Sequence, residues 1–174
     1  GLYVLINLNH PAIILGLVIA PLIVLYPLAK RFFIIPQLVL AMIYNWGSLI
    51  GWVTIQSPYK FNHILILYSA LIIWTIIYDT IYATQDEIDD RKMSLYSSVI
   101  FFDSKRFQII NFLICLKYAL LCFFAYSLNY HFIFYVLIIS VFIVNLLDIH
   151  MKWKNLSQNA IGYFKRNNHY ALLI

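Results

Sequence analysis

Five apolar stretches, each close to the length of a membrane span, constrain the fold of this chain more than any other feature. The stretches are Ala12–Tyr26, Pro36–Ile55, His63–Tyr82, Phe107–Leu128 and Phe132–Leu147. About 20 residues cross the hydrocarbon core of a bilayer, and a chain in lipid must satisfy its own backbone hydrogen bonds, which favours helices. Charged residues make up 11% of the sequence, against about 25% in soluble domains. We therefore expect an all-α fold, a polytopic transmembrane helical bundle with about five spanning helices.

The two ends of the chain do not resemble complete spans. The apolar tail Tyr170–Ile174 is interpreted as the start of a sixth helix that is cut short. Gly1 leads directly into an apolar stretch, without the charged segment and cleavage pattern of a signal peptide. We therefore expect the chain to be the later part of a longer protein. Cys115 and Cys122 share one helical face and are interpreted as buried side chains, because two cysteines supply neither a disulfide framework nor a zinc site.

Charged residues are distributed unequally between the two ends of the predicted helices. If the helices alternate in direction, all seven acids lie on one side, Lys60 lies on the other, and Lys117 falls inside the fourth helix. The other ten basic residues share the side of the acids: Lys30, Arg31, Arg91, Lys92, Lys105, Arg106, Lys152, Lys154, Lys165 and Arg166. Such an excess of Lys and Arg marks the cytoplasmic side of a membrane protein. It explains the net charge of +5 without a nucleic-acid partner.

Carboxylates cluster where the third predicted helix leaves the membrane. If residues 78–90 form one helix, Asp79, Asp86 and Asp90 lie within an arc of roughly 40°, and like charges at this spacing repel one another. A cation would offset that repulsion, and Mg²⁺ prefers carboxylate oxygens together with substrate phosphates. Two interpretations stay open at this point: a site for a magnesium diphosphate, or a solvated acidic loop that ends the helix.

Other polar residues have both an ordinary and a functional interpretation. Lys30 and Arg31 either anchor a helix end at the membrane surface or contact a substrate anion, for which the arginine fork is well suited. Lys117 either reaches the membrane surface, belongs to a shifted helix, or faces a cavity, because a charge at the bilayer centre is costly. Asn45 and Trp74 are interpreted as packing and interface residues.

Several short motifs occur in a recognisable order along the chain. They are Tyr26–Leu28 with Lys30 and Arg31, Pro36–Leu40, Asn45–Gly47, Tyr78–Ala83 with Asp86, Asp89 and Asp90, Ser97–Ser98, and Phe164–Asn168. Together these motifs resemble the UbiA-type family of intramembrane prenyltransferases, and the acidic segment resembles the second aspartate-rich motif of that family. The resemblance extends over nearly the whole chain.

The resemblance implies a helical bundle whose cavity opens to the membrane for a prenyl tail. It also implies transfer of a polyprenyl group from polyprenyl diphosphate to the ring of 4-hydroxybenzoate, an electrophilic aromatic substitution of ubiquinone biosynthesis, with Mg²⁺ as cofactor. The implied location is the bacterial plasma membrane with the acidic loop cytoplasmic, or the mitochondrial inner membrane in a eukaryote. The implied site residues are Asp86 and Asp90 for the metal, Asp79, Lys30 and Arg31 for catalysis, and Tyr82 and Asp89 for substrate binding.

The sequence also departs from the pattern of this family. The first aspartate-rich motif, Asn-Asp-x-x-Asp, does not occur in the chain. Ser94 and Tyr96 stand where the family usually has glycine and lysine, and Asp103 stands where glycine is common. We therefore expect residues 1–174 to be the C-terminal part of a UbiA-like domain, inactive alone, with a separate N-terminal fragment as a partner. The alternative is a non-enzymatic membrane module that binds lipid or quinone or belongs to a transporter.

Overall fold

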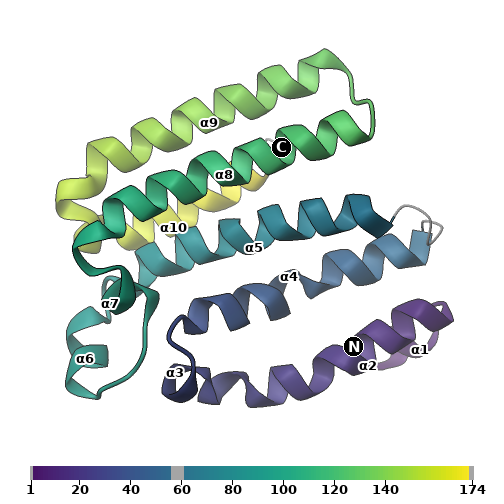
Figure 1. Cartoon of the computed structure of the whole chain (residues 1–174), viewed down its shortest axis with the longest axis horizontal. Coiled ribbons are helices and arrows are strands. Elements are labelled where there is room, and N and C mark those ends of the chain that lie inside the picture. Colours follow the sequence, from purple (N-terminus) through teal and green to yellow (C-terminus); the bar gives the residue numbers. More distant parts are fainter. Residues whose placement is uncertain (1, 56–60, 173–174) are drawn as a thin grey trace.

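The computed structural model describes residues 2–55 and 61–172, which are helical apart from short turns (Figure 1). The helices are α1 Leu2–Ile6, α2 His10–Leu25, η1 Tyr26–Leu28, α3 Ala29–Phe32, α4 Pro36–Ile55, α5 Phe61–Ala83, α6 Glu87–Lys92, α7 Ser98–Phe102, η3 Asp103–Lys105, α8 Arg106–Ser127, α9 Phe132–Lys152, η4 Trp153–Asn155 and α10 Leu156–Leu172. Five segments are long and apolar enough to cross a membrane: His10–Phe32, Pro36–Ile55, Phe61–Ala83, Ser98–Ser127 and Phe132–Lys152. The expectation of an all-α bundle with five spans is confirmed.

Helix α5 is the centre of the bundle. It packs between α4 and α8, with α2 beyond α4 and α9 beyond α8 (Figure 1). The largest buried cluster joins α5 to α8 and α9 and includes Ile77, Ile81, Ile110, Ile114 and Ile138. Helix α2 buries Ala12 and Ile19, so most of its apolar surface is left for contact with lipid. The polar residues of α5 are therefore held in the most closely packed part of the molecule.

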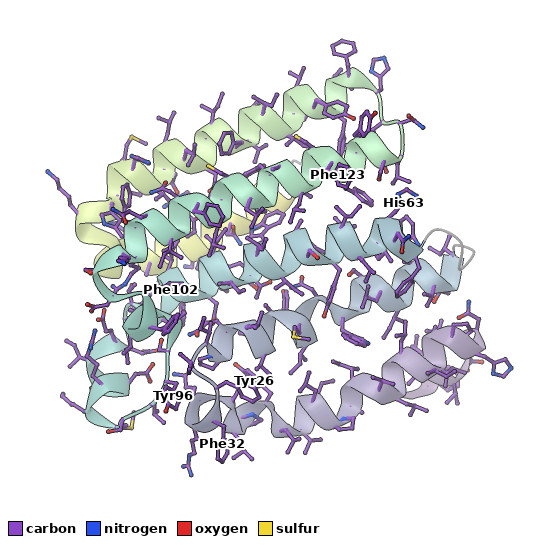
Figure 2. All side chains as sticks on the ribbon, viewed as in Figure 1. Tyr26, Phe32, His63, Tyr96, Phe102 and Phe123 are labelled. Atoms are coloured by element: carbon purple, nitrogen blue, oxygen red, sulfur yellow. The ribbon has the colours of Figure 1, made fainter. Side chains whose placement is uncertain are left out.

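Hydrogen bonds join the helices at both ends of the bundle. At one end, His63 Nδ1 on α5 lies 2.9 Å from Ser127 Oγ on α8. At the other end, the backbone N–H of Tyr96 donates to the carbonyl of Lys30 at 2.9 Å. Figure 2 shows Tyr26 and Tyr96 at this second end, far from His63. We call the second end, formed by α3, α6 and α7, the polar end.

The acidic segment is not one continuous helix, so the shared arc considered from the sequence does not exist. Helix α5 ends at Ala83, and α6 begins at Glu87. Between them, the N–H groups of residues 84–86 donate to carbonyls three residues earlier. The Thr84 hydroxyl also donates to the carbonyl of Ile81 at 2.7 Å. Such a side-chain bond competes with the regular helix ladder, and the chain turns here.

The last helix begins earlier than the sequence suggested. Helix α10 starts at Leu156, and residues 170–172 are its final turn rather than the start of a new span; residues 173–174 lie outside the described part of the chain. The helix runs back along α5 from the polar end (Figure 1). Its buried residues Ala160, Tyr163 and Asn167 recur at helical spacing, which is the stripe of an amphipathic helix. Because this segment is largely polar, hydropathy alone does not predict it as a helix of the bundle.

Candidate functional site

An ion pair across the polar end joins two segments sixty residues apart. Lys30 Nζ on α3 lies 3.0 Å from Asp90 Oδ1 and 3.1 Å from Oδ2 on α6. The Asp90 side chain is 3% exposed and that of Lys30 is 44% exposed. Because Asp90 is buried, it needs the lysine as its counter-charge. Lys30 also lies in the last turn of α3, where a cation is favoured by the helix dipole.

Most other acids at this end also have a basic partner. The ion pairs are Arg91 with Glu87 and Asp103, Arg106 with Glu87, Lys92 with Asp89, and both Lys152 and Arg166 with Asp148. The hydrogen bond to Glu87 raises the pKa of the Arg91 guanidinium. These pairs hold α6 against η3 and α8, and α10 against α9.

Asp79 and Asp86 are the two acids outside these ion pairs in the described ranges 2–55 and 61–172. Asp79 is partly buried near the end of α5, and Asp86 is exposed just before α6. Asp79 interacts electrostatically with both Lys30 and Asp86. Among the described residues no three carboxylate, imidazole or thiol groups converge on a metal site. Two free carboxylates still suit Mg²⁺, which usually takes one or two and completes its shell with phosphates and water.

The remaining predicted site residues differ in their surroundings. Arg31 is exposed on α3, next to Lys30. Tyr82 is 41% exposed, and its ring lies 5.4 Å from that of Phe164 on α10. Asp89 faces solvent in an exposed pair with Lys92. Four of the predicted site residues therefore lie together at the polar end: Lys30, Asp79, Asp86 and Asp90. Arg31 and Tyr82 lie at the edge of this group, and the Asp89 side chain points into solvent.

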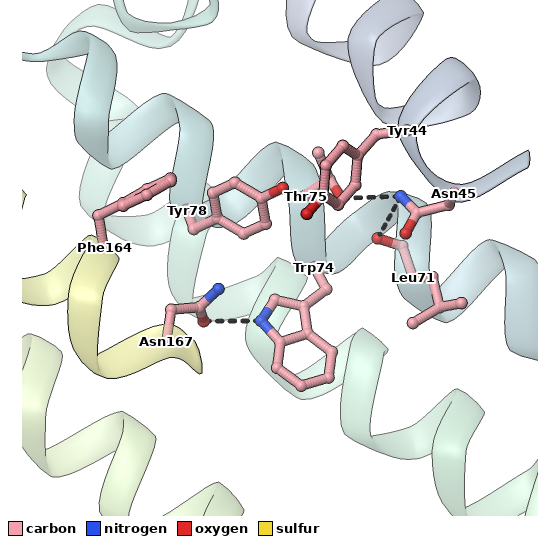
Figure 3. A pocket seen from close by; sticks show the side chains of 8 residues that line it. All are labelled: Tyr44, Asn45, Leu71, Trp74, Thr75, Tyr78, Phe164 and Asn167. Carbon is pink, nitrogen blue, oxygen red and sulfur yellow. Dashed lines mark hydrogen bonds between the residues drawn. The ribbon is translucent and has the colours of Figure 1, made fainter. Parts of the chain in front are cut away.

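An aromatic cavity of about 170 Å³ lies beside α5 (Figure 3), and one of its lining residues, Tyr78, directly precedes Asp79 in the sequence. Its lining residues come from α4, α5 and α10 and are Tyr44, Asn45, Leu71, Trp74, Thr75, Tyr78, Phe164 and Asn167. Asn45 Nδ2 donates to Thr75 Oγ1 at 2.7 Å, and Trp74 Nε1 donates to Asn167 Oδ1 at 2.6 Å. Asn45 and Trp74, which the sequence indicates as packing and interface residues, line this cavity instead. The sequence signal for this cavity is the presence of amide side chains, Asn45 and Asn167, inside or beside apolar stretches.

A second polar network fixes the segment that follows α6. The hydroxyls of Thr80 on α5 and Ser98 on α7 lie 2.7 Å apart. The backbone N–H of Ser98 donates to Gln37 Oε1 on α4 at 2.9 Å, and Gln37 Nε2 lies 3.5 Å from Ser97 Oγ. All four side chains are buried. The motif Ser97–Ser98 therefore has a structural role, which is to hold α7 against α4 and α5 beside the polar end.

Lys117 lies deep in the bundle and does not reach the membrane surface. Its side chain is 1% exposed, and Nζ lies 4.5 Å from the ring centroid of Trp74 and 4.0 Å from that of Tyr118. An ammonium group over aromatic faces gains cation–π attraction, which partly offsets its burial. Lys117 therefore contacts Trp74, one of the residues that line the cavity.

Two departures from the family pattern fall on unusual backbone conformations. Ser94 has φ 54° and Asp103 has φ 40°. Positive φ is accessible to glycine at little cost and is unfavourable for residues with a Cβ atom. The structure therefore gives a physical reason why glycine would suit both positions.

Five apolar helices that are long enough to span a membrane define a polytopic membrane protein, and its described residues place two carboxylates without ion pairs, Asp79 and Asp86, at the polar end. The chain belongs to the UbiA prenyltransferase family, whose sequence model matches residues 1–169.

Curated relatives point to one branch of this family. The chain is 46% identical over 102 residues to the mitochondrial 4-hydroxybenzoate polyprenyltransferase of Aedes aegypti, 45% over 102 residues to that of Drosophila melanogaster, and 42% over 102 residues to that of Rattus norvegicus. Each match covers 59% of this chain but 23%, 26% and 27% of the respective relative. The chain thus spans about a quarter of the length of these relatives. No solved structure matches the chain.

Proposed function

We propose that this chain forms part of an aromatic prenyltransferase that moves a polyprenyl group from its diphosphate to the ring of 4-hydroxybenzoate. The observation that carries the proposal is that Asp79 interacts electrostatically with both Asp86 and Lys30, while neither aspartate forms an ion pair within the described residues. Asp79 also directly follows Tyr78, which lines the aromatic cavity. The relatives described above are named for this reaction. Family membership and the site geometry support the same chemistry.

In this proposal Asp79 and Asp86 would hold Mg²⁺, which would neutralise charge on the departing diphosphate. Lys30 and Arg31 lie beside these two aspartates and would contact the phosphate oxygens. Arg31 would do so with bidentate hydrogen bonds from its guanidinium group. The C–O bond between the prenyl carbon and the diphosphate breaks, the allylic carbocation forms a C–C bond beside the ring hydroxyl, and the ring then loses a proton. Tyr78 and Tyr82 would border the reacting carbon from α5.

Asp90 was predicted as a metal ligand, and that role stays a prediction. In the structure its carboxylate is neutralised by Lys30. We propose that Asp90 positions Lys30 when the site is empty, and reaches the metal only if Lys30 moves to the substrate phosphates.

A binding experiment separates the enzyme proposal from a non-enzymatic membrane module. The purified chain in lipid nanodiscs is titrated with radiolabelled geranyl diphosphate, with Mg²⁺ or with EDTA. We expect binding that requires Mg²⁺ and weakens at least tenfold in Asp79→Asn and Asp86→Asn, because each change removes a charged ligand. Asp103→Asn is the matched control, since Asp103 is exposed and belongs to a surface pair. Binding that is unchanged by EDTA and by both aspartate substitutions would favour a lipid- or quinone-binding module.

Turnover is expected to need a second aspartate-rich segment. Residues 1–174 hold one such segment and no Asn-Asp-x-x-Asp sequence. We propose that this chain alone binds the diphosphate without transferring the prenyl group, and that a separate N-terminal fragment supplies the other carboxylates. We also propose that the polar end faces the cytoplasm in a bacterial plasma membrane, or belongs to the mitochondrial inner membrane in a eukaryote, because the basic residues gather there.

A further inference from the structure

One wall of the aromatic cavity is formed by the amide of Asn167. Asn167 is 7% exposed, and its Oδ1 accepts the indole N–H of Trp74. This bond fixes the orientation of the amide, so that Nδ2 lies on the side of Tyr78 (Figure 3). Among the described residues, the Asn167 amide is bonded to Trp74 through Oδ1, and the residue lines the cavity. The Nδ2 donor therefore borders a space that a ligand can fill, and a polar ligand atom placed there would gain a hydrogen bond.

The size and walls of the cavity suit one aromatic ring. A cavity of about 150 Å³ lined by apolar residues is large enough to bind benzene, and this one has about 170 Å³. The side chains of Tyr44, Trp74, Tyr78 and Phe164 surround it. Aromatic rings at these positions favour offset or edge-to-face contact with another ring.

The polarity of the lining narrows the choice further. A hydrocarbon chain would accept no hydrogen bond from the donor of Asn167. A carboxylate inside the cavity would have no counter-charge, because none of the described residues that line it is charged, and a buried charge without a partner is strongly unfavourable. A neutral hydroxyl group on an aromatic ring satisfies both conditions, since its oxygen accepts a hydrogen bond and it carries no charge.

We propose that this cavity binds the hydroxyl-bearing end of the aromatic acceptor, with Asn167 Nδ2 donating to the phenol oxygen. The inference rests on the proposed function, and it adds Asn167 as the residue that determines specificity for the hydroxyl group of the acceptor. The phenol ring then lies against Trp74 and Tyr78, the residue that precedes Asp79, and its carboxylate is directed out of the uncharged cavity. The protein distinguishes a phenol from an unsubstituted ring through a single amide.

The test compares two probes that differ only in the hydroxyl group. Binding of 4-hydroxybenzoate and of benzoate is measured on the full chain in nanodiscs, with Mg²⁺ and geranyl thiodiphosphate present. We expect 4-hydroxybenzoate to bind about tenfold more tightly, the size expected for one hydrogen bond. In Asn167→Leu this preference disappears, while Asn111→Leu, an amide on α8 outside the cavity, keeps it. Thermal unfolding of each variant checks that it is folded.

A second variant keeps the test independent of any effect of Asn167 on folding. Tyr44 is 70% exposed and lines the cavity, so Tyr44→Ala should weaken both probes equally by removing a wall but not the donor. Equal binding of the two probes to the unmodified chain, or an unchanged hydroxyl preference in Asn167→Leu, would overturn the inference. If geranyl diphosphate still binds with Mg²⁺ in that case, the proposed function stands and only the role of Asn167 fails. If neither the diphosphate nor the acid binds, both proposals fail.

Discussion

At the scale of single residues, the site depends on which charges are already neutralised. Four of the seven predicted site residues, Lys30, Asp79, Asp86 and Asp90, come together at the polar end, but Lys30 and Asp90 are paired with each other. The sequence could indicate that carboxylates cluster, because they are close along the chain. It could not indicate the pairing, because Lys30 and Asp90 are sixty residues apart and meet only through the packing of α3 against the α6–α7 segment.

Backbone strain gives a prediction at this same scale. Ser94 is exposed and has φ 54°, a conformation that costs a residue with a Cβ atom about 1–2 kcal/mol. Glycine removes this strain but is more flexible in the unfolded chain, which costs about 0.5–1 kcal/mol. We expect Ser94→Gly to stabilise the chain by about 0.5–1 kcal/mol, measured by thermal unfolding in detergent. Ser69→Gly, in the interior of α5, is the control and should be destabilising; a loss of stability in Ser94→Gly would contradict the account.

At the scale of elements, the same ion pair fastens α3 to α6. Lys30→Met leaves the 3%-exposed Asp90 carboxylate without a counter-charge, whereas Asp90→Asn leaves a lysine that is 44% exposed and can turn to water. We expect a cost of about 2 kcal/mol for Lys30→Met, lower than for a fully buried pair because Lys30 is half-exposed, and about 1 kcal/mol for Asp90→Asn. The result that supports this account is a larger loss of stability in Lys30→Met than in Asp90→Asn.

Limited proteolysis and chemical unfolding of the two variants and of the double variant measure this asymmetry. The double variant should be more stable than Lys30→Met, because it also removes the buried Asp90 charge that has lost its partner. Cleavage between α6 and α7 should increase most in Lys30→Met. Equal costs for both single variants would show that Asp90 finds another partner.

The elements themselves were predictable to different degrees, for physical reasons. The limits of α5 and α8 lie within two residues of the predicted spans, because apolar length alone determines where a helix leaves lipid. The turn after Ala83 depends on the Thr84 hydroxyl, and α10 depends on a stripe of buried residues in a polar segment. Hydropathy detects neither feature. The cavity was missed for the same reason, since Phe164 and Asn167 come from α10.

At the scale of the whole molecule, the bundle gathers its acidic side chains and their ion pairs at one end. Helix α8 runs from Arg106 to Ser127, which at about 1.5 Å per residue gives roughly 33 Å, enough to cross a hydrocarbon core of about 30 Å. Asp86 before α6 and Asn129 after α8 should therefore lie on opposite sides of the membrane. Because basic residues gather at the polar end, we propose that the Asp86 side faces the cytoplasm in a bacterial cell.

Cysteine labelling in intact cells tests this arrangement. Cys115 and Cys122 are first replaced by alanine, and either Asp86→Cys or Asn129→Cys is then introduced. A maleimide that cannot cross membranes should label the variant at position 129 in intact bacteria, and the variant at position 86 only after the cells are opened. The physical reason is that α8 lies between the two positions and is too long and apolar to lie on one side. Labelling of both positions from outside would refute the five-span topology, and with it the placement of Asp79 and Asp86 on the side where a diphosphate is available.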